Sequence, residues 1–225
     1  MIEYAFLGGG GNALELYDYM KSEGKKIVGY YDLHENEKLN LYLDYLGDEH
    51  NEKLNEKIHY IIASGLIPIR RKIISFIEEK NLIAGSFISQ RAYISSIAKF
   101  GKGFVVAPFA VCTGDASIGN YVYLNVYSLI GHGTVTGDNI IVGPGAMING
   151  DSEIGNEIMI GANASMLQGS KIGSNVEIAI GTFPKKKIKN NIFVFGNHVG
   201  NTTNISKESL TDEKNFNNCR GGSQS

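Results

Sequence analysis

A six-residue repeat constrains this chain more than any other feature, because it runs without interruption from Ile94 to Phe183. The stretch divides into fifteen hexapeptides, and their first residues are almost all large and apolar. These first residues are Ile94, Phe100, Val106, Cys112, Ile118, Leu124, Ile130, Thr136, Val142, Ile148, Ile154, Ile160, Met166, Ile172 and Ile178. A six-residue period fits neither a helix of about 3.6 residues per turn nor the alternation of one strand, and it is a signature of parallel β-helices.

Two other positions of the hexapeptide support a coil around a narrow prism. The fifth residue is mostly small or β-branched, as in Ala110, Ser128 and Ala146. The second residue is glycine in eight hexapeptides: Gly101, Gly119, Gly131, Gly137, Gly143, Gly155, Gly161 and Gly173. We expect the first residue to fill the prism, the fifth to pack beside it, and the glycine to form the corner.

The N-terminal segment has the pattern of a βαβ unit. A strand over 3–7 leads into the glycines Gly8, Gly9, Gly10 and Gly11, then a helix over 13–21 and a strand over 26–31 that ends at Asp32. Glycines before a helix N-terminus allow close approach of a phosphate, and an acid after the second strand is placed to bind a ribose or base. Because the run GGGGNA is not G-x-G-x-x-G, a tight turn and a simple strand-end cap at Asp32 remain alternatives.

A third strand over 58–63 and an amphipathic helix over 67–80 complete a small three-layer α/β domain. Arg70, near the start of this helix, is placed either to reach a nucleotide phosphate or to lie on a solvated face. We expect a Rossmann-like domain over 1–90, a β-helix domain over 91–200, and a polar, disordered tail over 201–225.

Charge and composition argue against several classes of function. The formal net charge is −2, which disfavours nucleic acid as a partner. There is no apolar run long enough for membrane insertion and no charged leader before an apolar core, so we expect a cytoplasmic protein. Cys112 occupies an inward position and is expected to be a core thiol. His34, His50 and His59 lack the spacing of metal ligands, so we expect no metal.

Inside the repeat, Asn125 and His132 carry chemistry beyond packing. His132 is the single histidine of the repeat and holds an outward position, where an exposed histidine without a role is the alternative. Asn125 stands at the second position, where an asparagine that simply tolerates a left-handed corner is the alternative.

The period also predicts which residues stack. If one coil holds three hexapeptides, each residue lies against the residue 18 positions later, so Gly150 lies against His132 and Gly143 against Asn125. A glycine N–H beside a histidine suits an oxyanion donor paired with a general base, which are the minimum parts for acyl transfer. After the repeat, Pro184 is expected to stop the strand ladder. Lys185 and Lys186, which follow, either meet the phosphates of CoA or form a solvated charge run.

The repeat and the βαβ unit before it resemble the nucleotide-sugar acetyltransferases of the PglD/NeuD/PerB type, within the left-handed β-helix (hexapeptide repeat) acyltransferase superfamily. The resemblance is most specific in Asn125-Val-Tyr-Ser-Leu-Ile-Gly-His132, in Gly143-Pro-Gly-Ala146 and in Asn149-Gly150. It implies a left-handed parallel β-helix of about five coils, acetyl-CoA as co-substrate, and a homotrimer with active sites between protomers.

The same resemblance implies roles for individual residues. His132 would be the general base, Asn125 would orient the sugar, and Gly150 would donate its N–H to the thioester oxygen. The nucleotide sugar would contact Gly8, Gly9, Gly10, Gly11, Asn12, Asp32, Ser64, Gly65 and Arg70. CoA would contact Gly143, Gly150, Gly161, Ala162, Ala179, Ile180, Lys185 and Lys186.

Three positions depart from the pattern of this family. The acid that often follows the catalytic histidine is replaced by Gly133, so a second protomer supplies an acid or His132 works unassisted. Asn12 stands where many members have a histidine or an aromatic residue. The C-terminal motif appears as Gly196-Asn197-His198-Val199.

The expected reaction is direct transfer of an acetyl group to the amine of a UDP- or GDP-linked 4-amino-deoxy sugar, in glycan or O-antigen synthesis. Two alternatives remain open from the sequence. One is an O-acetyltransferase of the sialic-acid type, and the other is a non-catalytic β-helix that binds a nucleotide sugar as a scaffold.

Overall fold

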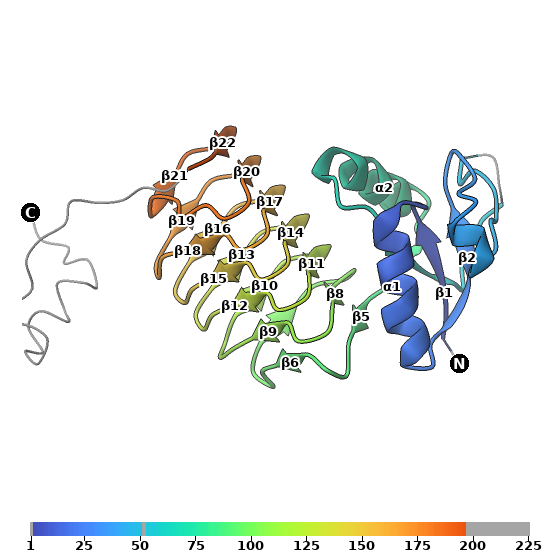
Figure 1. The fold of residues 1–225 in the computed structure, drawn as a ribbon, viewed down its shortest axis with the longest axis horizontal. Helices are drawn as coiled ribbons and strands as arrows, with labels where there is room; N and C mark the ends of the chain where they lie inside the picture. Colours follow the sequence, from blue (N-terminus) through green and yellow to red (C-terminus); the bar gives the residue numbers. More distant parts are fainter. Residues whose placement is uncertain (1, 51–52, 197–225) are drawn as a thin grey trace, which may run out of the picture.

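The computed structural model describes residues 2–50 and 53–196, which form a small α/β domain beside a long parallel β-helix (Figure 1). The tail expected over 201–225, and residues 197–200 of the expected β-helix domain, lie outside the described residues. No helix in the described part of the chain is long and apolar enough to span a membrane.

The N-terminal domain is built on a parallel sheet with strand order β2-β1-β3-β4. Its strands are β1 (Glu3–Leu7), β2 (Lys26–Tyr31), β3 (His59–Ile62) and β4 (Ile83–Ala84). Its helices are α1 (Gly11–Ser22), α2 (Ile67–Glu79) and the short 3-10 helix η1 (Leu39–Leu41). The expected Rossmann-like βαβ unit is confirmed.

The two long helices cover opposite faces of this sheet, because alternate residues of β1 point to opposite sides. Phe6 packs in one apolar cluster with Leu16 of α1, whereas Leu7 packs in another with Ile73 of α2. The sheet is therefore the middle layer of the three-layer α/β domain that the sequence predicted.

Three parallel sheets form the sides of the β-helix, which makes about six turns. The first sheet contains β5 (Phe87–Ile88), β8 (Val105–Val106), β11 (Val122–Leu124), β14 (Ile140–Val142), β17 (Ile158–Ile160), β20 (Val176–Ile178) and β22 (Ile192–Val194). The second contains β6 (Tyr93–Ile94), β9 (Val111–Cys112), β12 (Leu129–Ile130), β15 (Met147–Ile148) and β18 (Ser165–Met166). The third contains β7 (Lys99–Phe100), β10 (Ser117–Ile118), β13 (Val135–Thr136), β16 (Glu153–Ile154), β19 (Lys171–Ile172) and β21 (Lys187–Ile188).

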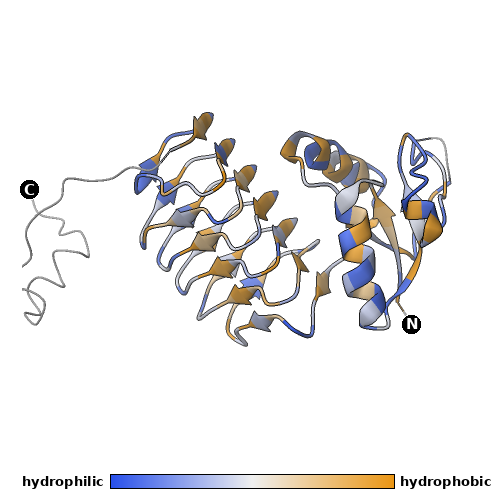
Figure 2. Cartoon of the chain, viewed as in Figure 1, coloured by the Kyte–Doolittle hydropathy of each residue, from blue (hydrophilic) through white to orange (hydrophobic). Residues whose placement is uncertain are grey.

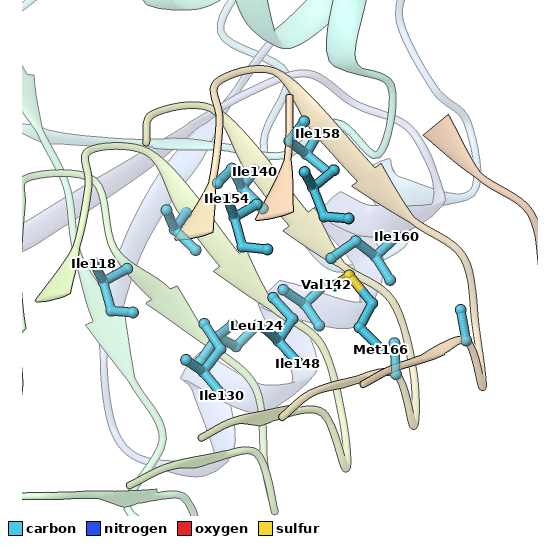
Figure 3. Close-up of a cluster of buried hydrophobic side chains, with 14 of the residues drawn as sticks. Ile118, Leu124, Ile130, Ile140, Val142, Ile148, Ile154, Ile158, Ile160 and Met166 are labelled. Carbon is cyan, nitrogen blue, oxygen red and sulfur yellow. The ribbon is translucent and has the colours of Figure 1, made fainter. Parts of the chain in front are cut away.

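The expected register of 18 residues per coil is confirmed by the strand pairs, such as Leu129 with Met147. First residues of the hexapeptides from Val106 to Ile178 fill the prism, and Figure 3 shows a cluster of buried side chains from this core. Cys112 is fully buried among them, and burial raises the pKa of its thiol to about 11. Phe100, one hexapeptide before Val106, lies outside this core, since it is 45% exposed and stacks on Phe104.

The β-helix is longer than the five coils expected, because pairing extends beyond both ends of the strict repeat. It begins at β5, just before the expected domain boundary, and continues after Pro184 through β21 and β22. Pro184 ends one sheet only: β18 is the last strand of the second sheet, while Lys171 still pairs with Lys187 in the third. The shorter spacing of this last coil removes one strand without breaking the other two ladders.

The expected cause of the corners was wrong. The left-handed backbone conformation falls on the fourth residue of nearly every hexapeptide, as in Asn139 (φ 54°) and Asp151 (φ 56°), and Asn125 is not among these residues. Glycine is needed at the second position for space, since a Cβ on Gly131 would lie 2.5 Å from the backbone nitrogen of Gly150 in the next coil.

The three sides of the prism meet different surroundings. Outward residues of the first sheet near the N-terminal domain, including Tyr123 and Ile141, are buried under it, whereas Glu177 and Phe193 farther along this sheet are exposed. Outward residues of the third sheet are exposed and mostly polar: Lys99, Ser117, Val135, Glu153, Lys171 and Lys187. Outward residues of the second sheet are mostly apolar and at least partly exposed: Tyr93, Val111, Leu129, Met147 and Ser165. Figure 2 shows the apolar character of many of the strands.

Arg70 joins the two domains. Its side chain is buried, and its guanidinium donates to Asn139 Oδ1 (3.0 Å), to the carbonyl oxygen of Tyr121 (2.6 Å) and to that of Ser64 (3.5 Å). Burial lowers the pKa of Arg70 to about 10, so it remains charged at neutral pH. The neighbouring Arg71 pairs with Glu157 (2.5 Å) at an exposed edge of the same junction.

The Arg70→Ala substitution is expected to lower the free energy of unfolding by about 2–4 kcal/mol, because it leaves buried acceptors without a donor. The Arg71→Ala control removes an exposed ion pair and should cost less than about 1 kcal/mol. Denaturant-induced unfolding of the two variants measures the difference, and equal costs would contradict the buried junction.

Candidate functional site

A cavity of about 650 Å³ lies at the carboxyl edge of the N-terminal sheet, where β1 meets α1. Its lining contains seven of the nine residues expected to contact a nucleotide sugar: Gly8, Gly10, Gly11, Asn12, Asp32, Ser64 and Gly65. The N-terminal turn of α1, with Gly10 as the N-cap, opens into this cavity. An N-terminus of this kind offers free N–H groups and positive dipole to a phosphate.

The glycine loop serves both packing and access. A Cβ on Gly9 would lie 2.6 Å from the ring of Tyr30, whereas a Cβ on Gly10 or Gly11 would meet nothing within 4 Å. Asp32 holds the loop, since its Oδ2 accepts the N–H of Gly9 (2.6 Å). Gly9 is thus required by packing, while the next two glycines leave the cavity open.

Several cavity residues were missed by the sequence analysis, among them Glu49, His50 and Lys72. In the described part of the chain, Glu49 Oε2 is buried without a hydrogen-bond partner, and burial raises the pKa of this carboxyl. Ligand atoms of Asp48, Glu49 and His50 lie within 4.8 Å of one another, although these histidine and acid positions were not expected to group. In the sequence, only the position of Glu49 and His50 in the loop after β2 could have indicated this, because that loop lies at the same sheet edge as the glycines.

Arg70 was expected at the phosphates, but it does not line this cavity. Its guanidinium is instead committed to the buried domain junction. Lys72, two residues later on α2, is a cation that does line the cavity.

His132 lies at the corner that follows β12, on the outer surface of the β-helix. Its side chain is 60% exposed. The 18-residue register stacks it between two glycines: a Cβ on Gly114 would lie 2.6 Å from His132 Cβ, and one on Gly150 would lie 2.7 Å from its Nε2 and Cε1. These glycines leave the space that the imidazole occupies.

Gly150 combines burial with an unused donor. Among the described residues its carbonyl oxygen accepts the N–H of Gly169 (2.8 Å), but its own N–H donates to no acceptor. Buried N–H groups without a partner are rare in folded proteins. An unpaired donor beside an exposed histidine is the arrangement that acyl transfer requires.

Asn125 lies at the opposite end of strand β12 from His132, at the preceding corner of the same coil. Its side-chain oxygen accepts the N–H of Val126 (2.7 Å) and its carbonyl oxygen accepts that of Ser128 (3.1 Å). Within one chain, Asn125 and His132 therefore lie at different corners of the β-helix.

The residues expected to bind CoA are divided between corners. Gly143, Gly161 and Ala179 follow Asn125 in one column, with Ala162 and Ile180 beside them; these stacks are fixed by bonds such as Gly143 N–H to the Ile160 carbonyl (2.8 Å). Lys186 lies near the His132 corner, with its Nζ 3.2 Å from the position of a Cβ on Gly169. Lys185 lines a smaller cavity at the end of the β-helix with Phe193 and Phe195.

One acid lies beside His132 that the sequence analysis did not name. Asp151 Oδ1 is 3.6 Å from His132 Nδ1, and Asp151 donates its own N–H to the His132 carbonyl oxygen (2.7 Å). The 18-residue register that placed Gly150 against His132 places the next residue here as well, so the signal was present.

Solved structures with this two-part arrangement are similar to the chain over most of its length. The acetyltransferase domain of PglB from Neisseria gonorrhoeae FA1090, in complex with acetyl coenzyme A, has a TM-score of 0.80 and 25% identity, covering 86% of this chain and 96% of that one. This chain has the fold of that acetyltransferase domain.

Two further structures share the fold. WeeI from Acinetobacter baumannii AYE has a TM-score of 0.77 and 22% identity, covering 87% of this chain and 97% of that one. A variant of perosamine N-acetyltransferase from Caulobacter crescentus, in complex with CoA and GDP-perosamine, has a TM-score of 0.77 and 18% identity, covering 87% and 94%. No protein-family model and no curated protein sequence matches the chain. The expected resemblance is confirmed in the fold.

The Gly10→Asp substitution is expected to weaken binding of UDP or GDP about 10-fold or more, because a carboxylate at the mouth of the cavity repels phosphate. The fold should tolerate it, since Asp is a favourable N-cap and a Cβ at Gly10 meets nothing within 4 Å. Gly10→Ser is the uncharged control. Calorimetric titration of both variants measures the effect, and equal affinities would argue against phosphate binding here.

Proposed function

We propose that the chain is an acetyl-CoA-dependent N-acetyltransferase that acts on the amino group of a nucleotide-linked amino sugar. The observation that carries the proposal is the N–H of the buried residue Gly150, which has no acceptor among the described residues and lies beside the exposed His132, on the fold of an acetyltransferase domain solved with acetyl coenzyme A. The nucleotide sugar as acceptor is supported by the glycine-lined cavity and by the shared fold of an enzyme solved with GDP-perosamine.

In the proposed reaction, the acceptor amine attacks the thioester carbonyl carbon of acetyl-CoA directly. His132 Nε2 takes the proton that the attacking nitrogen loses, and the Gly150 N–H stabilises the negative charge on the carbonyl oxygen. The tetrahedral intermediate then collapses with cleavage of the C–S bond, and CoA leaves as the thiolate. No covalent enzyme intermediate is required.

The nucleotide would occupy the N-terminal cavity, with its diphosphate at the N-terminus of α1 and Lys72 among the flanking residues. The unpaired Glu49 oxygen is an acceptor suited to an N–H group of the base. A UDP- or GDP-linked 4-amino-deoxy sugar is the acceptor that we propose, for glycan or O-antigen synthesis in the cytoplasm.

A homotrimer with active sites between protomers would complete this site. The apolar, partly exposed outer surface of the second sheet lies between the Asn125 corner and the His132 corner. Packing this surface against a second copy would remove residues such as Tyr93 and Met147 from water. It would also bring the Asn125 corner of one protomer, with its CoA-binding column, toward His132 of the next.

The proposal is tested by following CoA thiol release from acetyl-CoA against a panel of UDP-, GDP- and CMP-linked amino sugars. Turnover with a 4-amino sugar supports it. CoA binding without turnover on any amine, but with turnover on a sugar hydroxyl, would favour the O-acetyltransferase. Absence of CoA binding would favour the non-catalytic β-helix that binds a nucleotide sugar as a scaffold.

His132→Ala is expected to lower kcat by about 10²- to 10⁴-fold, since proton transfer by a positioned side chain contributes that much. CoA affinity should be retained, because His132 is not among the residues that we assign to CoA. The control His34→Ala changes an exposed histidine of the N-terminal domain. Steady-state kinetics and CoA titration measure kcat and CoA affinity for both variants. Near-normal turnover of His132→Ala would contradict the mechanism.

Met147→Glu is expected to dissociate the trimer, because it places a charge on the apolar outer surface of the second sheet. Val135→Glu is the matched control: Val135 is 52% exposed and Met147 42%, but Val135 lies on the polar third sheet. Light scattering after size-exclusion chromatography reports the mass of each. A trimer that survives Met147→Glu would place the interface elsewhere.

A further inference from the structure

Gly133, the residue after His132, carries no side chain, and an acid from the next coil lies where its side chain would point. A Cβ on Gly133 would be 2.4 Å from Asp151 Oδ1. We propose that Asp151 is the positioning residue for His132: its carboxylate accepts the Nδ1–H of the imidazole and leaves the Nε2 lone pair free for the proton of the acceptor. This role rests on the proposed function of His132 as general base.

The geometry singles out this acid. Among the described residues, Asp151 is the acid within 4.0 Å of a ring nitrogen of His132, with 3.6 Å between Oδ1 and Nδ1. That distance is longer than a direct hydrogen bond, so the bond that we propose requires these two exposed side chains to come closer. Contacts between catalytic groups commonly tighten when the substrate binds.

Asp151 is hydrogen-bonded to the coils on both sides, and one of these bonds reaches its carboxylate. Its Oδ2 accepts the side-chain N–H of Gln168 (2.7 Å), and its backbone N–H donates to the His132 carbonyl oxygen (2.7 Å). Oδ1 is therefore the oxygen left toward His132. The carboxylate is oriented before any proton moves.

Space, and not only backbone conformation, explains the glycine at position 133. Gly133 has φ 64°, but Asn139 and Asn163 adopt similar values at the same place in the hexapeptide, so a side chain is compatible with this conformation. What a side chain at 133 would meet is the Asp151 carboxylate. Asp151 thus occupies the space that the side chain of an acid directly after His132 would need.

Other charged groups near this corner have separate partners or positions. Asp115, one coil earlier, accepts the Gly133 N–H (2.9 Å). Lys186 lies beside Gly169, one coil beyond Asp151. Asp115 therefore provides a control for loss of negative charge at the same corner.

A carboxylate on Nδ1–H has two effects on a histidine base. It fixes the tautomer in which Nε2 carries the lone pair, and it stabilises the imidazolium that forms as the proton is taken. Both effects appear in kcat more than in substrate binding.

The test starts with Asp151→Asn and Asp151→Gly, which suit a positive φ and so should fold. We expect kcat to fall about 10-fold or more, with KM for acetyl-CoA and for the sugar changed less than about 3-fold. Asp115→Asn keeps an acceptor for Gly133 and should retain kcat. Asn163→Gly is the structural control for thermal stability, because Asn163 also lies 2.4 Å from a Cβ built on the glycine one coil earlier.

Moving the acid supplies the rescue. In Asp151→Gly the space beside Gly133 is vacated, so the double variant Gly133→Asp, Asp151→Gly places a carboxylate in the same region. It should recover most of the lost kcat, whereas Gly133→Asp alone brings its side chain against Asp151 and should not improve on the wild type. Failure of the double variant to recover any activity, with a wild-type melting temperature, would count against a positioning role.

Imidazole ¹⁵N NMR reports the tautomer of His132 directly and does not depend on turnover. The His132 signals, assigned by their loss in His132→Ala, should show a protonated Nδ1 in the wild type at neutral pH and a shift toward the Nε2–H tautomer in Asp151→Gly. Unchanged ¹⁵N shifts, or an unchanged kcat in Asp151→Gly while His132→Ala is inactive, would overturn the role of Asp151 and leave the proposed function standing. Absence of acetyl transfer by the wild type would instead remove the proposed function, and the NMR result would still stand for the pair.

Discussion

The parallel hydrogen-bond register between coils is the interaction on which the rest of this structure depends. Before the shorter last coil, each strand of the β-helix pairs with the strand 18 residues later, and this pairing decides which side chains and which bare backbone atoms meet on the surface. Gly114, His132 and Gly150 form a column for that reason alone. The six-residue period therefore determines which residues meet at this corner, whatever their identity.

The three sides of the prism also differ in their surroundings. One side is buried under the N-terminal domain along part of its length, one is polar and faces water, and one carries apolar side chains between two corners of chemical interest. Arg70 fixes the first of these contacts by donating to acceptors on the β-helix. The orientation of the cavity relative to the β-helix therefore rests on this buried cation, on the apolar contacts around it and on ion pairs such as that of Arg71 with Glu157.

Much of the fold followed from the sequence because its signals are local or periodic. Hexapeptide spacing predicted the register and the buried positions, and the glycine run predicted where the cavity lies, at the start of α1. The left-handed corner was misplaced because glycine suits both positive φ and close packing, and Gly131 serves the second purpose. Arg70 was misassigned because its acceptors are distant in sequence: Asn139 lies 69 residues away. Glu49 was missed because an irregular loop gives no period from which to place it.

Asp151 lies beside His132 because 19 residues separate them, one more than a full coil. The length of chain between the two is thus itself an element of the site. Adding or removing one residue in that interval would turn every later side chain by one position relative to His132, replacing both the bare N–H and the acid without altering either residue. Gain or loss of a whole coil of 18 residues farther along would leave this neighbourhood unchanged. In such a solenoid, segment length can alter chemistry as directly as a substitution does.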